Sequence, residues 1–208
     1  MKRELSVAMM LTLGFASAAF AETKTFTAKP NGWSRVTFES DAPIESIVGV
    51  STKVEGTIEV DPAAAKEGTK GKIEIDVASL NTGIALRDDH LRSKMWLDAE
   101  AHPKLTFELE KIKGIGALKA GKYVKGKARG KLTVKGQTRE VTLPVRVGLF
   151  EIPEGMKKQM PELKGDLLRV STQFELKLSD YGVQVPAMLG MKVSDKIKIR
   201  VDVSALSM

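Results

Sequence analysis

The sequence predicts an all-β protein in which about eight antiparallel strands close into a barrel, and three observations support this fold. From residue 26 onward, hydrophobic side chains recur at every second position, which is the period of a strand with one dry face. Glycine and proline separate these segments, and several segments exceed ten residues. Long strands of this kind must cover an apolar face and the sheet edges, and closure into a barrel does both. A two-layer sandwich is the alternative, although its strands are typically shorter.

The first 21 residues have the three parts of a secretory signal peptide. Lys2 and Arg3 provide a positive start, residues 5–20 form an apolar stretch, and the Ala-Phe-Ala sequence at 19–21 has the pattern that signal peptidase cleaves. The apolar stretch is short for a membrane anchor and contains serine and glycine. We therefore expect cleavage before Glu22 and a mature protein exported to the periplasm.

The composition indicates that residues 22–208 form one domain without disulfides. The chain contains no cysteine, so its stability must come from a packed interior, and its length suits a single core. The net charge is +7, and it is +6 without the signal peptide, which holds two basic residues and one acidic residue. Nucleic acid is not expected as a partner, because lysine alternates with acidic residues and aromatic residues are few.

Nine segments have the pattern and the turn boundaries of strands, and the first is an extension if the barrel has eight. They lie near residues 24–29, 34–40, 45–60, 70–78, 104–112, 121–135, 138–150, 167–179 and 195–204. In one of them, Ile73, Ile75 and Val77 alternate with charged residues, so one face is dry and the other wet. Between two others, Lys135-Gly136-Gln137 predicts a tight hairpin in which Gly136 has a positive φ.

Only residues 87–96 have the pattern of a helix. Asp88 and Asp89 lie in its first turn, where acidic side chains interact favourably with the helix dipole. Two Met-containing loops interrupt the strand pattern, and Pro161 and Pro186 argue against long helices in them.

Four segments carry a resemblance to a known family. Residues 82–93 (TGIALRDDHLRS) are similar to the T-x4-RD-x-HL-x-S motif of YceI-like proteins. Residues 96–107 resemble the aromatic-x-D and P-x-x-x-F continuation of that family, residues 130–139 its G-x-L-T-x-x-G-x-T-R hairpin, and residues 180–182 its D-[FY]-G element. The four segments occur in the family's order and cover most of the mature chain, so their combination is specific.

The resemblance implies a lipocalin-like barrel of eight antiparallel strands that binds polyisoprenoid lipids or isoprenoid quinones in a long internal pore. Two places depart from the family pattern. Residues 29–34 replace an Asp-x-x-His-Ser segment, and Leu178 stands where a basic residue often precedes the D-[FY]-G element. The family's polar ligand contacts are therefore not transferred to these positions.

We expect the dry faces of the strands to form the wall of the ligand site. An eight-stranded barrel is just wide enough to be filled by its own side chains or to hold one small ligand, and composition leaves both outcomes open. The expected wall residues are Ile73, Ile75, Val77, Leu105, Phe107, Leu132, Val134, Leu143, Val145, Val170, Phe174, Leu176, Ile197, Ile199 and Val201. The expected mouth residues are Arg87, His90, Trp96, Asp180, Tyr181, Met188 and Met191.

Arg87 has two interpretations at this mouth. Its guanidinium can bind an anionic headgroup bidentately, or it can pair with Asp88 or Asp180 and hold the helix against the barrel. For Asp88 and His90 the structural role is favoured, with His90 packed beneath the helix. The methionines of the loops form either a flexible entrance or simple gap-filling contacts.

Lipid binding is the leading functional hypothesis, and two others stay open. One is an enzyme that acts on a lipid-like substrate with His90 as base, and the other is an empty barrel that acts through its surface in a stress response. No catalytic residue, cofactor or metal is expected, because nucleophile and phosphate-loop motifs are absent and His90 and His102 lack metal-ligand spacing. The expected partners are an isoprenoid lipid or quinone and, transiently, a membrane, while a homodimer is left open.

Overall fold

The structure is a computed structural model that describes residues 22–66 and 68–207. The predicted signal peptide, residues 1–21, lies outside the described residues. Ten strands form one antiparallel sheet. They are β1 (Lys24–Ala28), β2 (Arg35–Asp41), β3 (Ser46–Ser51), β4 (Val54–Val60), β5 (Lys70–Asp76), β6 (Lys104–Lys113), β7 (Tyr123–Val134), β8 (Gln137–Glu151), β9 (Asp166–Lys177) and β10 (Lys196–Ser207).

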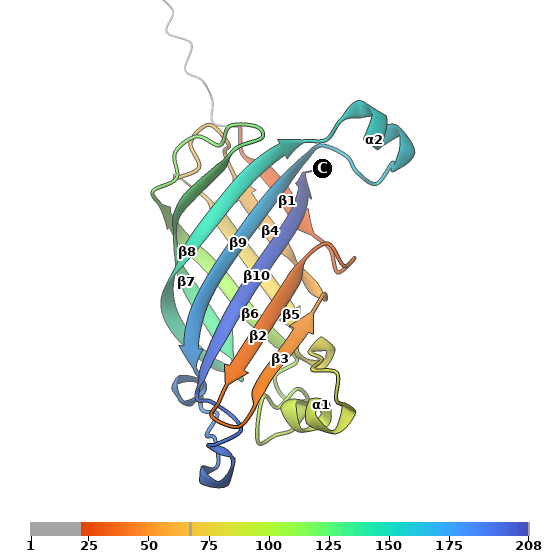
Figure 1. The fold of residues 1–208 in the computed structure, drawn as a ribbon. Coiled ribbons are helices and arrows are strands. Elements are labelled where there is room, and N and C mark those ends of the chain that lie inside the picture. The colour runs from red at the N-terminus through yellow and green to blue at the C-terminus, as the bar shows by residue number, and fades with distance from the viewer. Residues whose placement is uncertain (1–21, 67, 208) are drawn as a thin grey trace, which may run out of the picture.

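The sheet closes because its first strand pairs with its last (Figure 1). β1 pairs with β4 on one side, and on the other side Phe26 and Thr27 of β1 pair with Ser207 and Leu206 of β10. The closed ring therefore contains eight strands, β1 and β4 to β10. This result confirms the predicted eight-stranded antiparallel barrel and rules out the sandwich.

β2 and β3 lengthen the barrel at one end instead of widening it. β2 pairs with residues 197–202 of β10, and β3 pairs with β2. The prediction of one continuous strand over 45–60 is wrong, because the chain breaks between β3 and β4. At the break, the Lys53 amide donates to Ser51 Oγ at 3.0 Å and Ser51 Oγ lies 2.6 Å from Ser79 Oγ. Local side-chain hydrogen bonds thus replace the sheet ladder there.

β5 also ends earlier than its alternating pattern predicts. Asp76 caps a short 3-10 helix, η1 (Val77–Ser79), by accepting a hydrogen bond from the Ala78 amide at 2.9 Å. The strand therefore stops at residue 76, and Val77 turns away from the strand face on which it was expected.

The hairpin between β7 and β8 confirms its sequence prediction. Val134 pairs with Gln137, so the turn contains only Lys135 and Gly136, with φ values of 47° and 71°. Two consecutive positive φ values are the requirement of a type I′ turn, whose twist matches that of the flanking strands.

Helices occupy the connections at both ends of the barrel (Figure 1). The predicted helix 87–96 is observed as α1 (Ala85–Arg92), and a second short helix, α2 (Glu154–Gln159), lies between Pro153 and Pro161 at the opposite end. Two further 3-10 helices, η2 (Leu178–Tyr181) and η3 (Ala187–Leu189), connect β9 to β10 at the α1 end. Among residues 22–66 and 68–207, no helix is long and apolar enough to cross a bilayer.

Two clusters of buried side chains stabilise the barrel. The larger contains Phe26, Val54, Leu168 and Ala205 and includes the seam where β1 meets β10. The smaller contains Val77 and Tyr181 and gathers side chains from η1, η2 and the connection around α1. Each cluster joins elements that are far apart in the sequence, so each stabilises closure of the ring.

Candidate functional site

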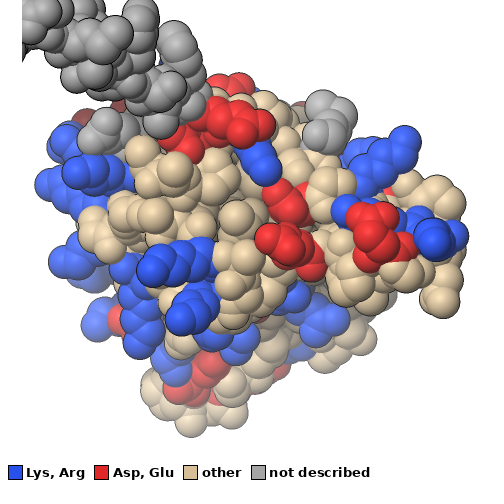
Figure 2. All heavy atoms as spheres, turned by 90° about the horizontal axis from the view of Figure 1, so that it is seen from above, with Lys and Arg blue, Asp and Glu red and all other residues tan. Residues whose placement is uncertain are grey.

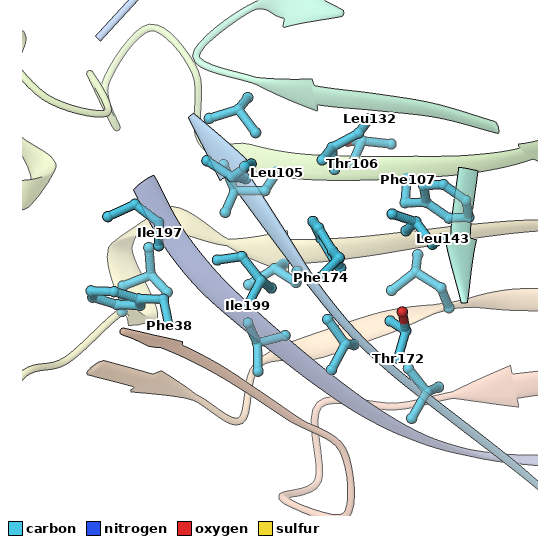
Figure 3. A pocket seen from close by; sticks show the side chains of 18 of the residues that line it. Phe38, Leu105, Thr106, Phe107, Leu132, Leu143, Thr172, Phe174, Ile197 and Ile199 are labelled. Carbon is cyan, nitrogen blue, oxygen red and sulfur yellow. The ribbon is translucent and has the colours of Figure 1, made fainter. Parts of the chain in front are cut away.

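The interior of the barrel holds a cavity of about 700 Å³. Its lining comes from β2 to β10, with β1 as the exception, and it is mainly aliphatic and aromatic. The connections at both ends also contribute, with Arg87 and Leu189 at the α1 end and Ala65, Ile115 and Leu118 at the opposite end. Figure 3 shows Phe38, Phe107, Phe174 and Ile199 among the side chains that surround the space. The strands therefore enclose an open cavity. Composition had left two outcomes open, a ligand cavity and an interior filled by side chains, and the structure shows the cavity.

Fourteen of the fifteen expected wall residues line this cavity. They are Ile73, Ile75, Leu105, Phe107, Leu132, Val134, Leu143, Val145, Val170, Phe174, Leu176, Ile197, Ile199 and Val201. The exception is Val77, which is fully buried in the smaller cluster and does not line the cavity. Its placement on the wall was wrong because Asp76 ends β5 one residue before it.

The expected mouth residues divide into two groups. Arg87, His90 and Trp96 line the cavity at the α1 end. Asp180, Tyr181, Met188 and Met191 do not contribute to its lining: Asp180 and the two methionines are exposed, and Tyr181 is buried against the smaller cluster. In the same connection, Leu189 and Val193 line the cavity instead.

Arg87 is held by a set of contacts that the sequence did not predict. Its Nη1 donates to Glu45 Oε1 at 2.6 Å, its Nε donates to Thr82 Oγ1 at 2.9 Å, and its Nη2 donates to the Thr82 carbonyl at 3.3 Å. Of the two interpretations left open for Arg87, the structural one gave the wrong partners, because the ion pair is made with Glu45 and not with Asp88 or Asp180. The reason is tertiary, because Glu45 comes from the β2–β3 turn, 42 positions away in the sequence.

Asp88 has the structural role that was favoured for it. It is buried, and its Oδ1 accepts hydrogen bonds from the Thr82 amide at 2.8 Å and from Thr82 Oγ1 at 2.6 Å. Because Thr82 in turn accepts from Arg87, the three residues fix the loop that precedes α1. His90, in contrast, is exposed at the mouth instead of being packed beneath the helix.

Sequence reasoning missed part of the lining. Phe38 of β2 and Ile58 of β4 line the cavity, as do Leu178 of η2 and Val183, which follows η2. The alternation of Val36 and Phe38 was a usable signal for β2. The residues of the connection gave no periodic signal, because a loop reaches the cavity through tertiary packing alone.

Exposed apolar side chains surround the mouth. We call the set of Ile44, Ile84, Leu86, Met95, Met188 and Met191 the apolar rim. Leu86 is 67% exposed and Met188 is 87% exposed. The rim comes from the β2–β3 turn, the α1 region and the β9–β10 connection, and the Ile44 amide donates to the Met191 carbonyl at 2.9 Å. Figure 2 shows the opposite end, where charged side chains of both signs lie beside uncharged ones.

Tyr181 has a perturbed pKa in the smaller cluster. Burial raises the pKa of its phenol above the ordinary value of 10.0, and the neighbouring Asp180 carboxylate raises the pKa further. The phenol is thus kept neutral, as its apolar surroundings require.

Comparison with known proteins decides the family. A family model described as a YceI-like domain matches residues 26–205. The chain belongs to the YceI-like family. The four motifs quoted above are thus family motifs within one continuous YceI-like domain. All four lie at the α1 end of the barrel, where Lys135 Nζ of the hairpin donates to the Met95 carbonyl and Arg139 Nε donates to the Asp180 carbonyl.

Curated relatives of this YceI-like chain include UPF0312 proteins. One from Vibrio cholerae is 28% identical over 142 residues, covering 67% of this chain and 66% of that protein. One from Photorhabdus laumondii is 33% identical over 128 residues, covering 55% of this chain and 62% of that protein. The matched stretch therefore spans just under two thirds of the length of these relatives.

Solved structures share the YceI-like barrel. BcnA of Burkholderia cenocepacia matches with a TM-score of 0.64 and 25% identity, over 83% of this chain and 96% of that one. A polyisoprenoid binding domain from Saccharophagus degradans, implicated in plant cell wall breakdown, matches with a TM-score of 0.66 over 90% of this chain and 100% of that one. At 14% identity, the second likeness shows the fold alone.

Proposed function

We propose that this YceI-like protein binds a long apolar lipid of the isoprenoid class inside the barrel and carries it through the periplasm. The observation that carries the proposal is the cavity of about 700 Å³ with its apolar lining. That volume lies within the range of about 300–1,000 Å³ that is usual for ligand pockets. The fold shared with a polyisoprenoid binding domain supports the proposal.

The energetics of lipid transfer indicate what such a carrier must provide. Burial of an apolar chain from water stabilises by about 0.8 kcal/mol per CH₂. A chain taken from a bilayer gains almost nothing on entering an equally apolar cavity, because both environments exclude water. Net affinity must therefore come from shape and from polar contacts, while the rate depends on how the lipid reaches the mouth.

The apolar rim provides a route to the mouth. Exposed side chains such as Leu86 and Met188 are positioned to enter the surface of a bilayer, so that a lipid passes into the cavity without crossing water. Methionine suits this contact, because its flexible side chain adapts to irregular apolar surfaces. Transient membrane contact at the α1 end is therefore part of the proposed function.

We place binding ahead of catalysis because His90 lacks the arrangement of a general base. Such a base is normally oriented by a hydrogen-bonded partner. In the part of the chain that the structure describes, the His90 imidazole has no hydrogen-bonded side chain beside it. Family membership and the shared fold point the same way.

The test is to identify what the protein carries when it is isolated from cell envelopes without detergent. Native mass spectrometry, followed by solvent extraction, is expected to find one long-chain isoprenoid lipid per protein. A periplasmic protein without a cavity, prepared in parallel, controls for lipid that adheres nonspecifically. A protein that emerges empty and takes up no isoprenoid from vesicles contradicts the proposal and favours a surface role. Sequencing of the mature N-terminus is expected to begin at Glu22 in the periplasmic fraction.

A further inference from the structure

One hydroxyl interrupts the apolar wall at the middle of β9. Val170, Thr172, Phe174 and Leu176 all line the cavity, because they share one face of the strand. Three of the four are apolar, and Thr172 alone carries a polar atom. Figure 3 shows its oxygen among carbon side chains.

The neighbours of Thr172 on the adjacent strands are all valines. Thr172 pairs with Val145 of β8 on one side and with Val201 of β10 on the other, and Val201 pairs with Val36 of β2. All three valines line the cavity. Valine has the same shape as threonine, so packing alone does not explain the hydroxyl at this position.

The Thr172 hydroxyl has no partner within the protein. Among the residues that the structure describes, only two buried side-chain polar atoms lack a hydrogen bond, and Thr172 Oγ1 is one of them. Three other hydroxyls of the lining are engaged within the protein: Ser40 Oγ accepts from the Ser194 amide at 2.9 Å, Thr69 Oγ1 donates to the Ala65 carbonyl, and Thr82 Oγ1 donates to Asp88 at 2.6 Å. Thr106 of β6 also borders the cavity, but its hydroxyl is not one of the two buried atoms without a partner. A ligand group that hydrogen-bonds to Thr172 Oγ1 would therefore gain that interaction without breaking one within the protein.

The position of Thr172 makes the hydroxyl available to a ligand. In this rotamer the oxygen exposes less than 1 Å², while the side chain as a whole is only partly buried beside the cavity. Rotation about χ1 exchanges the hydroxyl and the methyl group, and threonine adopts more than one χ1 rotamer. The hydroxyl then offers one donor and two acceptor lone pairs to the interior.

We propose that Thr172 is the polar anchor of the cavity and that the ligand presents to it an uncharged oxygen, either an alcohol or a carbonyl. This inference rests on the proposed lipid-binding function. A charged group is excluded at this depth, because the cross-strand neighbours are valines and burial of an unpaired charge is prohibitive. The cationic side chains of the lining, Arg87 and Lys192, come from the connections at the α1 end, and Arg87 is already paired with Glu45.

The test compares four ligands on the delipidated mature protein, by displacement of a fluorescent naphthylamine probe. The ligands are geranylgeraniol, the matching hydrocarbon without the hydroxyl, geranylgeranyl phosphate and a short-chain menaquinone. The wild type is expected to bind the alcohol or the quinone more tightly than the hydrocarbon, and to bind the phosphate more weakly than the alcohol. The hydrocarbon reports whether the cavity itself is intact in every variant.

Three variants isolate the hydroxyl. Thr172→Val keeps the shape, and we expect it to reduce the preference for the oxygen-bearing ligand over the hydrocarbon about fivefold to tenfold, as for loss of one hydrogen bond. Thr172→Ser keeps the hydroxyl and is expected to retain the preference. Ser171→Ala removes the hydroxyl of the adjacent residue, which does not line the cavity and whose register partners on the neighbouring strands, Arg146 and Asp202, do not line it either; this variant is expected to change nothing.

The outcomes separate this inference from the proposed function. If the wild type binds the hydrocarbon but Thr172→Val changes no preference, or if the phosphate binds more tightly than the alcohol, the anchor is overturned while lipid binding stands. If the wild type binds none of the apolar ligands, both fail. Thr172→Val can also lose the preference over the hydrocarbon for one of the two oxygen-bearing ligands and keep it for the other. That result supports the anchor and shows whether the alcohol or the quinone supplies the oxygen.

Discussion

At the α1 end, two residues that are adjacent in the sequence have different roles in the same hydrogen-bonded loop. Arg87 and Asp88 are adjacent in the sequence, yet both act on Thr82, one donating to it and the other accepting from it. Their shared partner fixes the loop before α1 at the mouth of the cavity. Arg87, for which the sequence left a headgroup contact open, thus joins Asp88 in holding the mouth in shape.

Tyr181 gives a prediction for the pH dependence of stability. Because burial raises the pKa of Tyr181 in the folded state, its contribution is fully present below about pH 10 and is lost as the pH rises through the folded pKa. Tyr181→Phe keeps the packing and is expected to change stability by less than about 1.5 kcal/mol at neutral pH. Denaturant unfolding is expected to show a smaller decrease in stability above pH 10 for Tyr181→Phe than for the wild type.

The comparison with the wild type is needed because two lysines also make the stability of the protein fall as the pH rises. The pKa of Lys24 is raised by its hydrogen bond to Asp166, and the pKa of Lys104 by its hydrogen bond to Glu55. Both contributions also disappear at high pH, and both are retained in Tyr181→Phe. Identical alkaline profiles for the two proteins contradict the role assigned to Tyr181.

At the scale of elements, the connections determine how the two ends of the barrel differ. The β2–β3 turn, the α1 region and the β9–β10 connection converge at the mouth and provide the apolar rim. At the other end, α2 also exposes methionines, Met156 and Met160, but neither lines the cavity. The two ends therefore allow a matched comparison between similar side chains in different places.

If the apolar rim enters the membrane, the double variant Met188→Ser, Met191→Ser is expected to take up lipid from neutral vesicles about tenfold more slowly. The reason is that burial of one Met side chain in the membrane surface is worth up to about 1.5–3 kcal/mol. Neither methionine lines the cavity, so affinity measured without vesicles is expected to stay unchanged. Uptake is followed by transfer of a fluorescent isoprenoid. Met156→Ser with Met160→Ser is the control at the opposite end, and equal slowing in both double variants contradicts the assignment of the mouth.

At the scale of the whole molecule, closure and cavity depend on each other. The ring closes at a short seam in which two residues of β1 pair with residues 206–207 of β10, while β2 pairs with residues 197–202 of the same edge. The barrel thus encloses a space that its own side chains do not fill. A ligand that occupies this space binds only the folded state and stabilises it by mass action.

We expect the delipidated protein to gain about 2.7 kcal/mol when geranylgeraniol is present at about a hundred times its Kd. For a barrel of this size, that gain raises Tm by roughly 5–10 °C. Val145→Phe fills part of the cavity and is expected to abolish most of the increase, whereas Val48→Phe on the exposed face of β3 is expected to retain it. A Tm that does not respond to the lipid in the wild type, measured by scanning calorimetry, contradicts a ligand-accessible interior.

Sequence periodicity predicted most of the strands, favoured a barrel over a sandwich and placed fourteen of the fifteen wall positions, because alternation on a strand is a local pattern and an apolar strand face must be buried. The Lys135-Gly136 hairpin was equally local, since its φ values depend on residue type. The remaining features could not be read from local patterns: the break at Ser51, the end of β5 at Asp76 and the Arg87–Glu45 pair each need a partner from another part of the chain or a cap that competes with the ladder. The vacancy of the barrel also belongs to tertiary structure, because the same alternating pattern is compatible with a filled interior and with an open one, and only the packing distinguishes them.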